Sequence, residues 1–209
     1  MTTETGSAPA GDPLRALALA LAPRPVVLVA TLSAAGKLNV APFSMVTPLS
    51  VEPPLLGLGI SPRREGGLKT TLTNIIETGE FVVNTAGEAL LPAAVAASLD
   101  AGEPGPRRFE TEPSEIVRPP CIAGAVAQLE CRLVEILRPG GSSTRLVVGQ
   151  IVRLHFGDTL LGNQAGAHTE ALPGHLAMEA PGVHQFLVGG RLLRVAAEGV
   201  GSAGAGRHR

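Results

Sequence analysis

The stretch from Thr31 to Asn84 constrains the fold most, because it joins an interrupted strand to a basic turn that leads directly into a helix. Pro42 interrupts a strand-like run, since proline has no backbone N–H to give to a sheet ladder. The run RREGGLKTT, residues 63–71, places glycines and positive charges at the start of a predicted helix, 69–78. Unpaired N–H groups and the partial positive charge of a helix N-terminus favour anions. This turn therefore predicts an anion or phosphate site beside the broken strand.

The rest of the pattern is one of short strands in hairpins with two or three helices inserted. Strands are predicted at 26–33, 38–50, 55–61, 80–85, 127–137 and 145–156, and helices at 14–21, 69–78 and 88–99. The apolar alternation slips by one place after Leu133, which predicts a β-bulge, and Glu130 is expected on the polar face of its strand. Strands and helices do not alternate and no GxGxxG opens a βαβ unit, which disfavours a doubly wound dinucleotide fold. The sequence predicts a mainly β, small barrel.

The ends of the chain and two internal stretches lack a clear period. Residues 1–12 and 199–209 are predicted to be disordered tails around a single domain, 13–198. The stretch 100–120 is predicted to be a long loop, of the kind that often serves as a lid or interface arm. Residues 157–181 are expected to be loop-like, and 183–195 could add one strand, at 186–188 or 192–195.

Composition excludes several classes of protein. Hydrophobic residues make up 44 % and charged residues 17 % of the 209 residues, as in a folded globular domain. The net charge of −1 gives no reason to expect nucleic acid or an anionic membrane as a partner. No apolar run is as long as a membrane span. The first residues lack the basic and apolar regions of a signal peptide, so a cytoplasmic location is expected.

Two groups of residues that can carry chemistry are interpreted as structural. Cys121 and Cys131 have neither redox nor metal-type spacing, so both are expected to be buried thiols. His168, His175 and His184 lie in loop-like sequence without the HExxH spacing of a metal site, so they are expected to be solvated. The sequence thus predicts no metal and no catalytic acid or base.

Several motifs occur in an order that resembles a known family. They are Pro23-Arg24-Pro25, Asn39-Val40-Ala41-Pro42-Phe43-Ser44, Pro53-Pro54-Leu55, Lys69-Thr70-Thr71-Leu72-Thr73-Asn74-Ile75 and Thr78-Gly79-Glu80-Phe81-Val82-Val83-Asn84. Over the range 23–156 this order resembles the flavin reductase-like, FMN-binding split-barrel family. That family includes flavoredoxin and the reductase components of two-component monooxygenases. The resemblance implies a split β-barrel.

The resemblance also implies site residues. Those beside the FMN phosphate would be Arg63, Gly67, Lys69, Thr70, Thr71 and, as a secondary candidate, Asn74. Those along the isoalloxazine ring and ribityl chain would be Thr31, Ser33, Ala41, Pro42, Phe43 and Ser44. Either Arg63 or Arg64 is expected near the phosphate. From the residues alone, the competing interpretation is a solvated helix start, ordinary strand hydroxyls and a core phenylalanine.

The resemblance finally implies an activity and partners. It implies an NAD(P)H:flavin oxidoreductase, in which NADH or NADPH passes hydride to N5 of FMN. It also implies a homodimer with the flavin near the subunit interface, and a monooxygenase that receives the reduced flavin. Two other classes stay open, namely a non-enzymatic FMN-binding electron carrier and a flavin-free structural or binding dimer.

Overall fold

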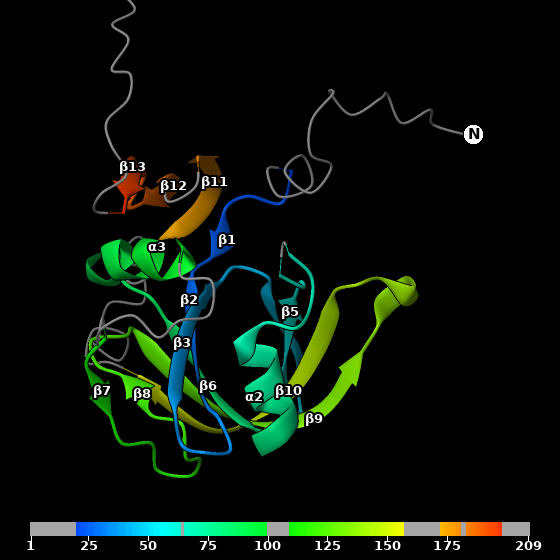
Figure 1. Ribbon diagram of the computed structural model, residues 1–209. Helices are drawn as coiled ribbons and strands as arrows, with labels where there is room; N and C mark the ends of the chain where they lie inside the picture. The colour runs from blue at the N-terminus through cyan, green and yellow to red at the C-terminus, as the bar shows by residue number, and fades with distance from the viewer. Residues whose placement is uncertain (1–19, 64, 100–108, 157–171, 181–182, 198–209) are drawn as a thin grey trace, which may run out of the picture.

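The computed structural model describes residues 20–63, 65–99, 109–156, 172–180 and 183–197. These residues form a seven-stranded sheet, a four-stranded sheet and a two-stranded ribbon, all antiparallel, together with helices α2 and α3 (Figure 1). Helix α3 lies between the four-stranded sheet and the large sheet, and α2 packs on a different part of the large sheet (Figure 1). The predicted tails and the predicted helix 14–21, apart from its last two residues, lie outside the described residues.

The seven-stranded sheet is curled into a barrel. Its strands in spatial order are β3 (Leu38–Phe43), β2 (Val27–Leu32), β6 (Glu80–Thr85), β9 (Ala127–Leu137), β10 (Arg145–Phe156), β5 (Pro54–Ile60) and β4 (Val46–Val51). The two edge strands, β3 and β4, are joined only by Ser44 and Met45. Two residues span about 7 Å, so the two edges must come together at this end. The mainly β, split-barrel fold is thus confirmed, and we call this meeting point the seam.

The strands follow from their apolar pattern. Strand β2 is buried on both faces, as the continuous apolar run predicted. Its side chains Val27 and Val29 enter the barrel core, whereas Leu28 and Ala30 pack outside it, against a cluster that includes residues of α3. The bulge predicted in β9 is confirmed, because Val134 is the residue skipped where β9 pairs with β10.

Pro42 interrupts strand β3 less than predicted. The break was expected from Ala41 to Ser44, but β3 continues through Pro42, which pairs with Leu28, and ends at Phe43. An edge strand tolerates proline because only one of its sides is hydrogen-bonded to a neighbour. The predicted strand 38–50 is therefore two strands, interrupted only at the seam.

Helix α2 (Thr70–Thr78) matches the predicted helix 69–78. A glycine directly after a helix predicts a left-handed end, and Gly79 has a φ of 69°. Its buried residues are Thr71, Leu72, Asn74 and Ile75. The helical spacing of Leu68, Leu72, Ile75 and Ile76 predicts one buried apolar face. That prediction was wrong for Leu68 and Ile76, which are 44 % and 53 % exposed. Two polar side chains occupy the buried face instead, because they find hydrogen-bond partners on the sheet below.

The four-stranded sheet was largely missed by the sequence analysis. Its order is β1 (Arg24–Pro25), β11 (Gly174–Ala180), β12 (Val183–Val188) and β13 (Arg191–Ala196). The loop predicted for 157–181 was therefore wrong at 174–180, and 183–195 holds two strands rather than one. Gly189 and Gly190 both have positive φ, 52° and 74°, which suits the tight turn that joins β12 to β13. That Gly-Gly pair was the available signal.

The remaining elements are short. Helix α3 (Leu91–Leu99) follows a 3₁₀ turn (Glu88–Leu90), together matching the predicted helix 88–99. Strands β7 (Thr111–Glu112) and β8 (Cys121–Ile122) pair with each other, so the stretch predicted as a loop has a short strand at 111–112. A second 3₁₀ turn, Pro139–Gly141, connects β9 to β10. Its place matches the turn that the sequence predicts there.

Gly149 of β10 has no room for a side chain. A Cβ added there would lie 2.4 Å from Cζ of Phe81, whose ring is fully buried. We expect Gly149→Ala to lower the free energy of unfolding by about 1–3 kcal/mol, the usual cost of overpacking a core. Urea denaturation measures the loss. Gly87→Ala is the matched control, because its added Cβ would lie 3.3 Å from its nearest neighbour. Equal losses at the two positions would contradict the packing argument.

Candidate functional site

Residues 41–44, which the resemblance places along the isoalloxazine ring, lie at the end of β3 beside the seam. We call them the ring segment. Ala41 and Phe43 pack against the barrel core, and Phe43 is only 8 % exposed. The hydroxyl of Ser44 accepts a hydrogen bond from Nε of Arg24 at 3.2 Å. The segment is therefore fixed by the core on one side and by a positively charged side chain on the other.

The basic turn, described at residues 63 and 65–67, has hydrogen bonds within its own backbone. The N–H of Arg63 donates to the carbonyl of Gly67 at 3.1 Å, and the N–H of Gly66 donates to the carbonyl of Arg63 at 3.0 Å. Gly66 and Gly67 have φ of 93° and 83°, a conformation that other residues rarely adopt. Nη2 of Arg63 donates to Oγ1 of Thr70 at 2.8 Å, which directs this guanidinium to the start of α2.

Lys69 connects the basic turn to the ring segment. It is the N-cap residue of α2, and its side chain makes no capping hydrogen bond. Its ammonium nitrogen lies 5.3 Å from the centre of the Phe43 ring, within cation–π range. Burial lowers the pKa of Lys69. The first turn of α2 contains no acidic residue, so its N–H groups and the two basic side chains suit an anion.

Three of the predicted site residues form a hydrogen-bonded network under α2. Nδ2 of Asn39 donates to Oγ1 of Thr31 at 3.3 Å and to Oγ1 of Thr71 at 3.0 Å. Nδ2 of Asn74 donates to the same Thr31 oxygen at 3.1 Å. Thr31, Thr71 and Asn74 are all buried. Their position is thus explained by the attachment of α2 to β2 and β3, and their contact with a cofactor stays a prediction.

Ser33 lies apart from the ring segment. Its hydroxyl accepts a hydrogen bond from the N–H of Lys37 at 3.1 Å, in the turn between β2 and β3. The ring segment is at the other end of this hairpin, about 17–20 Å away for six-residue strands. The structure therefore does not bring Ser33 together with Phe43 or Ser44.

A pocket opens between the ring segment, α3 and the four-stranded sheet. Its apolar wall includes Pro42, Phe43, Val95 and Phe186, and its polar side chains include His175 and His184. The apolar lining and the few polar groups are typical of a site for a flat organic molecule. Three residues of the ring segment, Pro42, Phe43 and Ser44, line this pocket.

The interpretation of His175 and His184 as solvated loop residues was wrong. Both are half-buried on strands β11 and β12, where the sequence analysis expected loop or a single strand. Nδ1 of His175 lies 2.8 Å from Nη2 of Arg24, and Nε2 of His175 lies 3.0 Å from Nδ1 of His184. Burial, reinforced by the neighbouring His184 and Arg24, lowers the pKa of His175 to about 4. Burial also lowers the pKa of His184. His168 lies outside the described residues.

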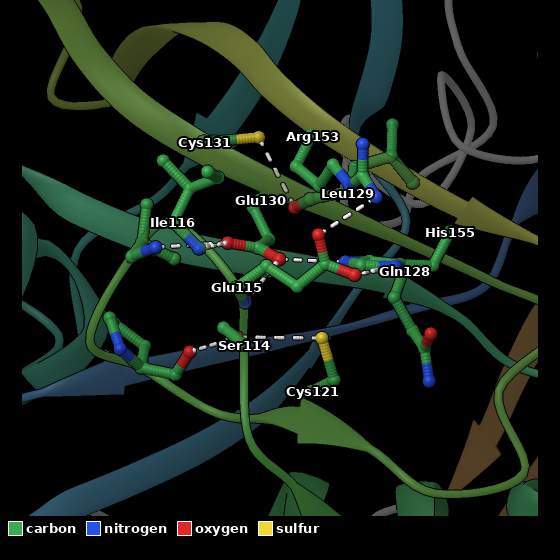
Figure 2. A network of polar contacts seen from close by, with 12 residues as sticks. Ser114, Glu115, Ile116, Cys121, Gln128, Leu129, Glu130, Cys131, Arg153 and His155 are labelled. Carbon is green, nitrogen blue, oxygen red and sulfur yellow. Dashed lines mark hydrogen bonds and ion pairs between the residues drawn. The ribbon is translucent and has the colours of Figure 1, made fainter.

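Glu130 was also misassigned, since its side chain is fully buried rather than on a polar strand face. Its carboxylate accepts hydrogen bonds from the N–H groups of residues 115, 116 and 117, at 2.7–2.9 Å, and faces Nε2 of His155 at 2.6 Å (Figure 2). Burial alone would raise the pKa of Glu130, but these hydrogen bonds lower it to about 2. The buried charge therefore organises the chain segment that precedes β8.

The same network includes a group of atoms that could hold a metal ion. Donor atoms of Cys121, Glu130 and His155 lie within 4.8 Å of one another. The carboxylate already accepts four hydrogen bonds, and burial raises the pKa of the Cys121 thiol. Both features favour a structural network over a preformed metal site. Both cysteines are free and buried, as predicted.

Comparison with known proteins identifies the family. Residues 19–172 match the model of the family described as "Flavin reductase like domain". The chain belongs to the flavin reductase-like family. An uncharacterised protein of Halalkalibacterium halodurans, BH2278, is 34 % identical over 169 residues, which cover 76 % of this chain and 79 % of that protein.

Two solved structures share the fold of this flavin reductase-like protein. One is nitrilotriacetate monooxygenase component B from Bacillus cereus, with a TM-score of 0.71, 24 % identity, and coverage of 95 % of this chain and 97 % of that one. The other is the NADH:FAD oxidoreductase SgcE6 from Streptomyces globisporus, with a TM-score of 0.61, 18 % identity, and coverage of 91 % and 99 %. Membership of the family implies oxidoreductase chemistry with a flavin as cofactor or substrate. Of the helices in the described part of the chain, none combines the length and apolar character needed to cross a bilayer.

The buried Glu130 carboxylate makes the stability of this flavin reductase-like protein depend on pH. Lowering its pKa from 4.5 to about 2 corresponds to about 3 kcal/mol of stability, present above pH 4.5 and lost as the pH falls toward 2. We expect Glu130→Gln to be less stable than wild type by about this amount at pH 7, and to lose less stability between pH 4.5 and pH 2. Urea denaturation across pH 2–7 measures both effects.

The matched control is Glu88→Gln, because Glu88 is an exposed carboxylate paired with Arg191. Such surface pairs contribute about 0–1 kcal/mol, so this variant should follow the wild-type pH profile. If Glu130→Gln also followed that profile, the Glu130 carboxyl would have to ionise in the folded protein as it does in the unfolded chain.

Proposed function

We propose that this protein is an FMN-dependent NAD(P)H:flavin oxidoreductase that supplies reduced flavin to a monooxygenase partner. The observation that carries the proposal is the meeting of the basic turn and the ring segment at the N-terminus of α2. Lys69 is the residue that touches both, through α2 and through the ring of Phe43. A phosphate and a flat ring system, joined by a short chain, fit this pair of neighbouring sites.

The phosphate end of the proposed site follows from the positive charge at the start of α2. Arg63 and Lys69 both lie at the start of α2, and no acidic side chain is in its first turn. Arg63 donates to Thr70, so its guanidinium is already oriented toward the helix N-terminus. A phosphate there would receive charge-assisted hydrogen bonds from side chains and from backbone N–H groups. Arg63 is the arginine of this turn whose contacts are described. Arg64 lies outside the described residues, so the choice between the two stays a prediction.

The ring end of the proposed site follows from shape and polarity. The pocket beside the ring segment has apolar walls and a few polar groups at its edge. Phe43 and Pro42 offer flat apolar surface, and the Ser44 hydroxyl is held in place by Arg24. When bound, the flavin supplies the two-electron chemistry, so the protein has to bind, orient and shield it. No side chain is needed as a catalytic acid or base.

The proposed hydride donor and the proposed monooxygenase partner are taken from proteins of the same fold. Of the two solved structures, one is an NADH:FAD oxidoreductase and the other is a monooxygenase component. We therefore propose NADH or NADPH as the donor and a separate monooxygenase as the recipient. A homodimer is proposed because the resemblance to the family implies one, and the cytoplasmic location stays a prediction.

The phosphate assignment predicts a selective loss of FMN affinity. Lys69→Ala and Arg63→Ala should each weaken FMN binding by about tenfold or more, since a hydrogen bond to a charged group contributes about 1.5–3 kcal/mol. Riboflavin, which lacks the phosphate, should bind these variants as it binds wild type. Fluorescence titration with the two flavins measures the affinities. Lys37→Ala is the matched control, because Lys37 is exposed in the turn at the far end of the hairpin. Parallel losses for FMN and riboflavin would contradict the assignment.

The reductase assignment is tested on the same protein with FMN bound. Anaerobic NADH or NADPH should bleach the flavin absorbance within seconds, and the faster donor identifies the preference. Flavin that is bound but not bleached would replace the reductase with an electron carrier. Protein that binds neither FMN nor FAD would overturn the proposed function.

A further inference from the structure

A chain of hydrogen bonds runs from the ring segment through His175 and His184 to the surface. We call it the histidine relay, and its members are Ser44, Arg24, His175, His184 and Ser98. Arg24 bonds to Ser44 and lies 2.8 Å from His175, which lies 3.0 Å from His184. Nε2 of His184 lies 3.4 Å from the hydroxyl of Ser98, in the last turn of α3. The relay thus crosses three separate parts of the fold.

The direction of these bonds is fixed by the chemistry of arginine. A guanidinium can only donate, so Nδ1 of His175 must accept and carries no proton. The proton of His175 is then on Nε2, which donates to Nδ1 of His184. His184 in turn carries its proton on Nε2, facing the Ser98 hydroxyl, which donates to the carbonyl of Val95 at 2.6 Å. The bond from Arg24 to His175 requires a neutral His175, and the bond from His175 to His184 requires a neutral His184, each in one tautomer.

The surroundings keep the imidazoles neutral. Arg24 faces His175 from β1, His184 faces it from β12, and the Phe186 ring meets it edge-on at 5.4 Å. Within the described residues, no carboxylate forms an ion pair with either histidine. Burial and the Arg24 charge lower the pKa of His175 to about 4, so protonation at pH 7 is rare. The relay is therefore intact at neutral pH.

The same contacts restrict the guanidinium of Arg24. Two of its nitrogens are engaged on different elements, Nε on Ser44 and Nη2 on His175. Arg24 and His175 are also direct partners in the β1–β11 ladder. A long, flexible side chain is thus held in one position beside the ring segment, where its charge is only partly screened by water.

We propose that His175, supported by His184, is a positioning residue that holds the Arg24 charge beside the flavin ring and so favours the reduced flavin. This inference rests on the proposed function, because it needs a flavin at the ring segment. Reduced flavin carries more negative charge than oxidised flavin. A positive charge fixed nearby therefore stabilises the reduced form more and raises the reduction potential of the bound flavin. Holding the charge in place in advance avoids the cost of orienting it later.

The test compares two substitutions at one position in the full-length protein with FMN bound. His175→Phe keeps an aromatic ring but removes the acceptor for Arg24. His175→Asn keeps an acceptor close to the place of Nδ1. In His175→Phe, we expect the ratio of the affinity for reduced FMN to the affinity for oxidised FMN to be about tenfold lower than in wild type. This corresponds to a fall of about 30 mV in the two-electron reduction potential. His175→Asn should retain most of the wild-type potential, and Arg24→Gln should lower it at least as far as His175→Phe. Spectroelectrochemical titration measures the potentials.

Each outcome separates the inference from the proposed function. Wild type that binds no flavin overturns both. Wild type that binds and reduces FMN, with equal potentials in all variants, overturns only the inference. A fall in Arg24→Gln without a fall in His175→Phe would assign the charge effect to Arg24 and remove His175 from it. Thermal unfolding and the affinity for oxidised FMN serve as structural readouts. If His175→Phe changed these alone, its role would be structural and the inference would fail.

Discussion

The two-residue link between β3 and β4 is the constraint on which the rest of the structure depends. Because Ser44 and Met45 join the two edge strands of one sheet, that sheet has to curl until its edges meet. The link also determines the place of the candidate site, because the backbone N–H and C=O groups at the seam are not all used in hydrogen bonds between strands. Pro42 is accepted there for the same reason, as a residue of an edge strand. The fold and the candidate site thus share one local cause.

Buried polar groups in this protein serve two different purposes. Away from the seam, the carboxylate of Glu130 and the amide of Asn84 replace missing backbone partners. Asn84 donates to the carbonyls of Leu28 and Val82 and accepts from the N–H of Ile122. Such groups remain buried only because all their hydrogen bonds are made. At the seam, polar groups instead face a pocket, and they keep donors and charge oriented toward a space that a ligand can enter.

The sequence predicted those features that depend on near neighbours. The apolar run of β2, the left-handed Gly79 and the bulge at Val134 all follow from residues within a few positions of one another. The basic turn and the start of α2 were found in the same way. Glu130 and His175 were not, because the groups that define them are remote in sequence. The partner of His175, Arg24, is 151 residues away. A lone histidine has no local signal for such a contact, although Gly189-Gly190 did signal the hairpin that carries it.

The distribution of positive charge explains how a chain with a net charge of −1 can suit an anionic cofactor. Lys69, next to the basic turn, lies over the ring of Phe43, and Arg24 donates to Ser44. In the proposed site, Lys69 and the basic turn would face a phosphate that is charged in every redox state, so they would contribute to affinity alone. Arg24 would lie beside the ring, where charge changes on reduction, so it would also affect the balance between the two redox states. Both effects are local, since screening by salt removes the influence of charges more than about 10 Å away at the surface. Neutral imidazoles can accept from Arg24 and hold it in place without adding a charge of their own.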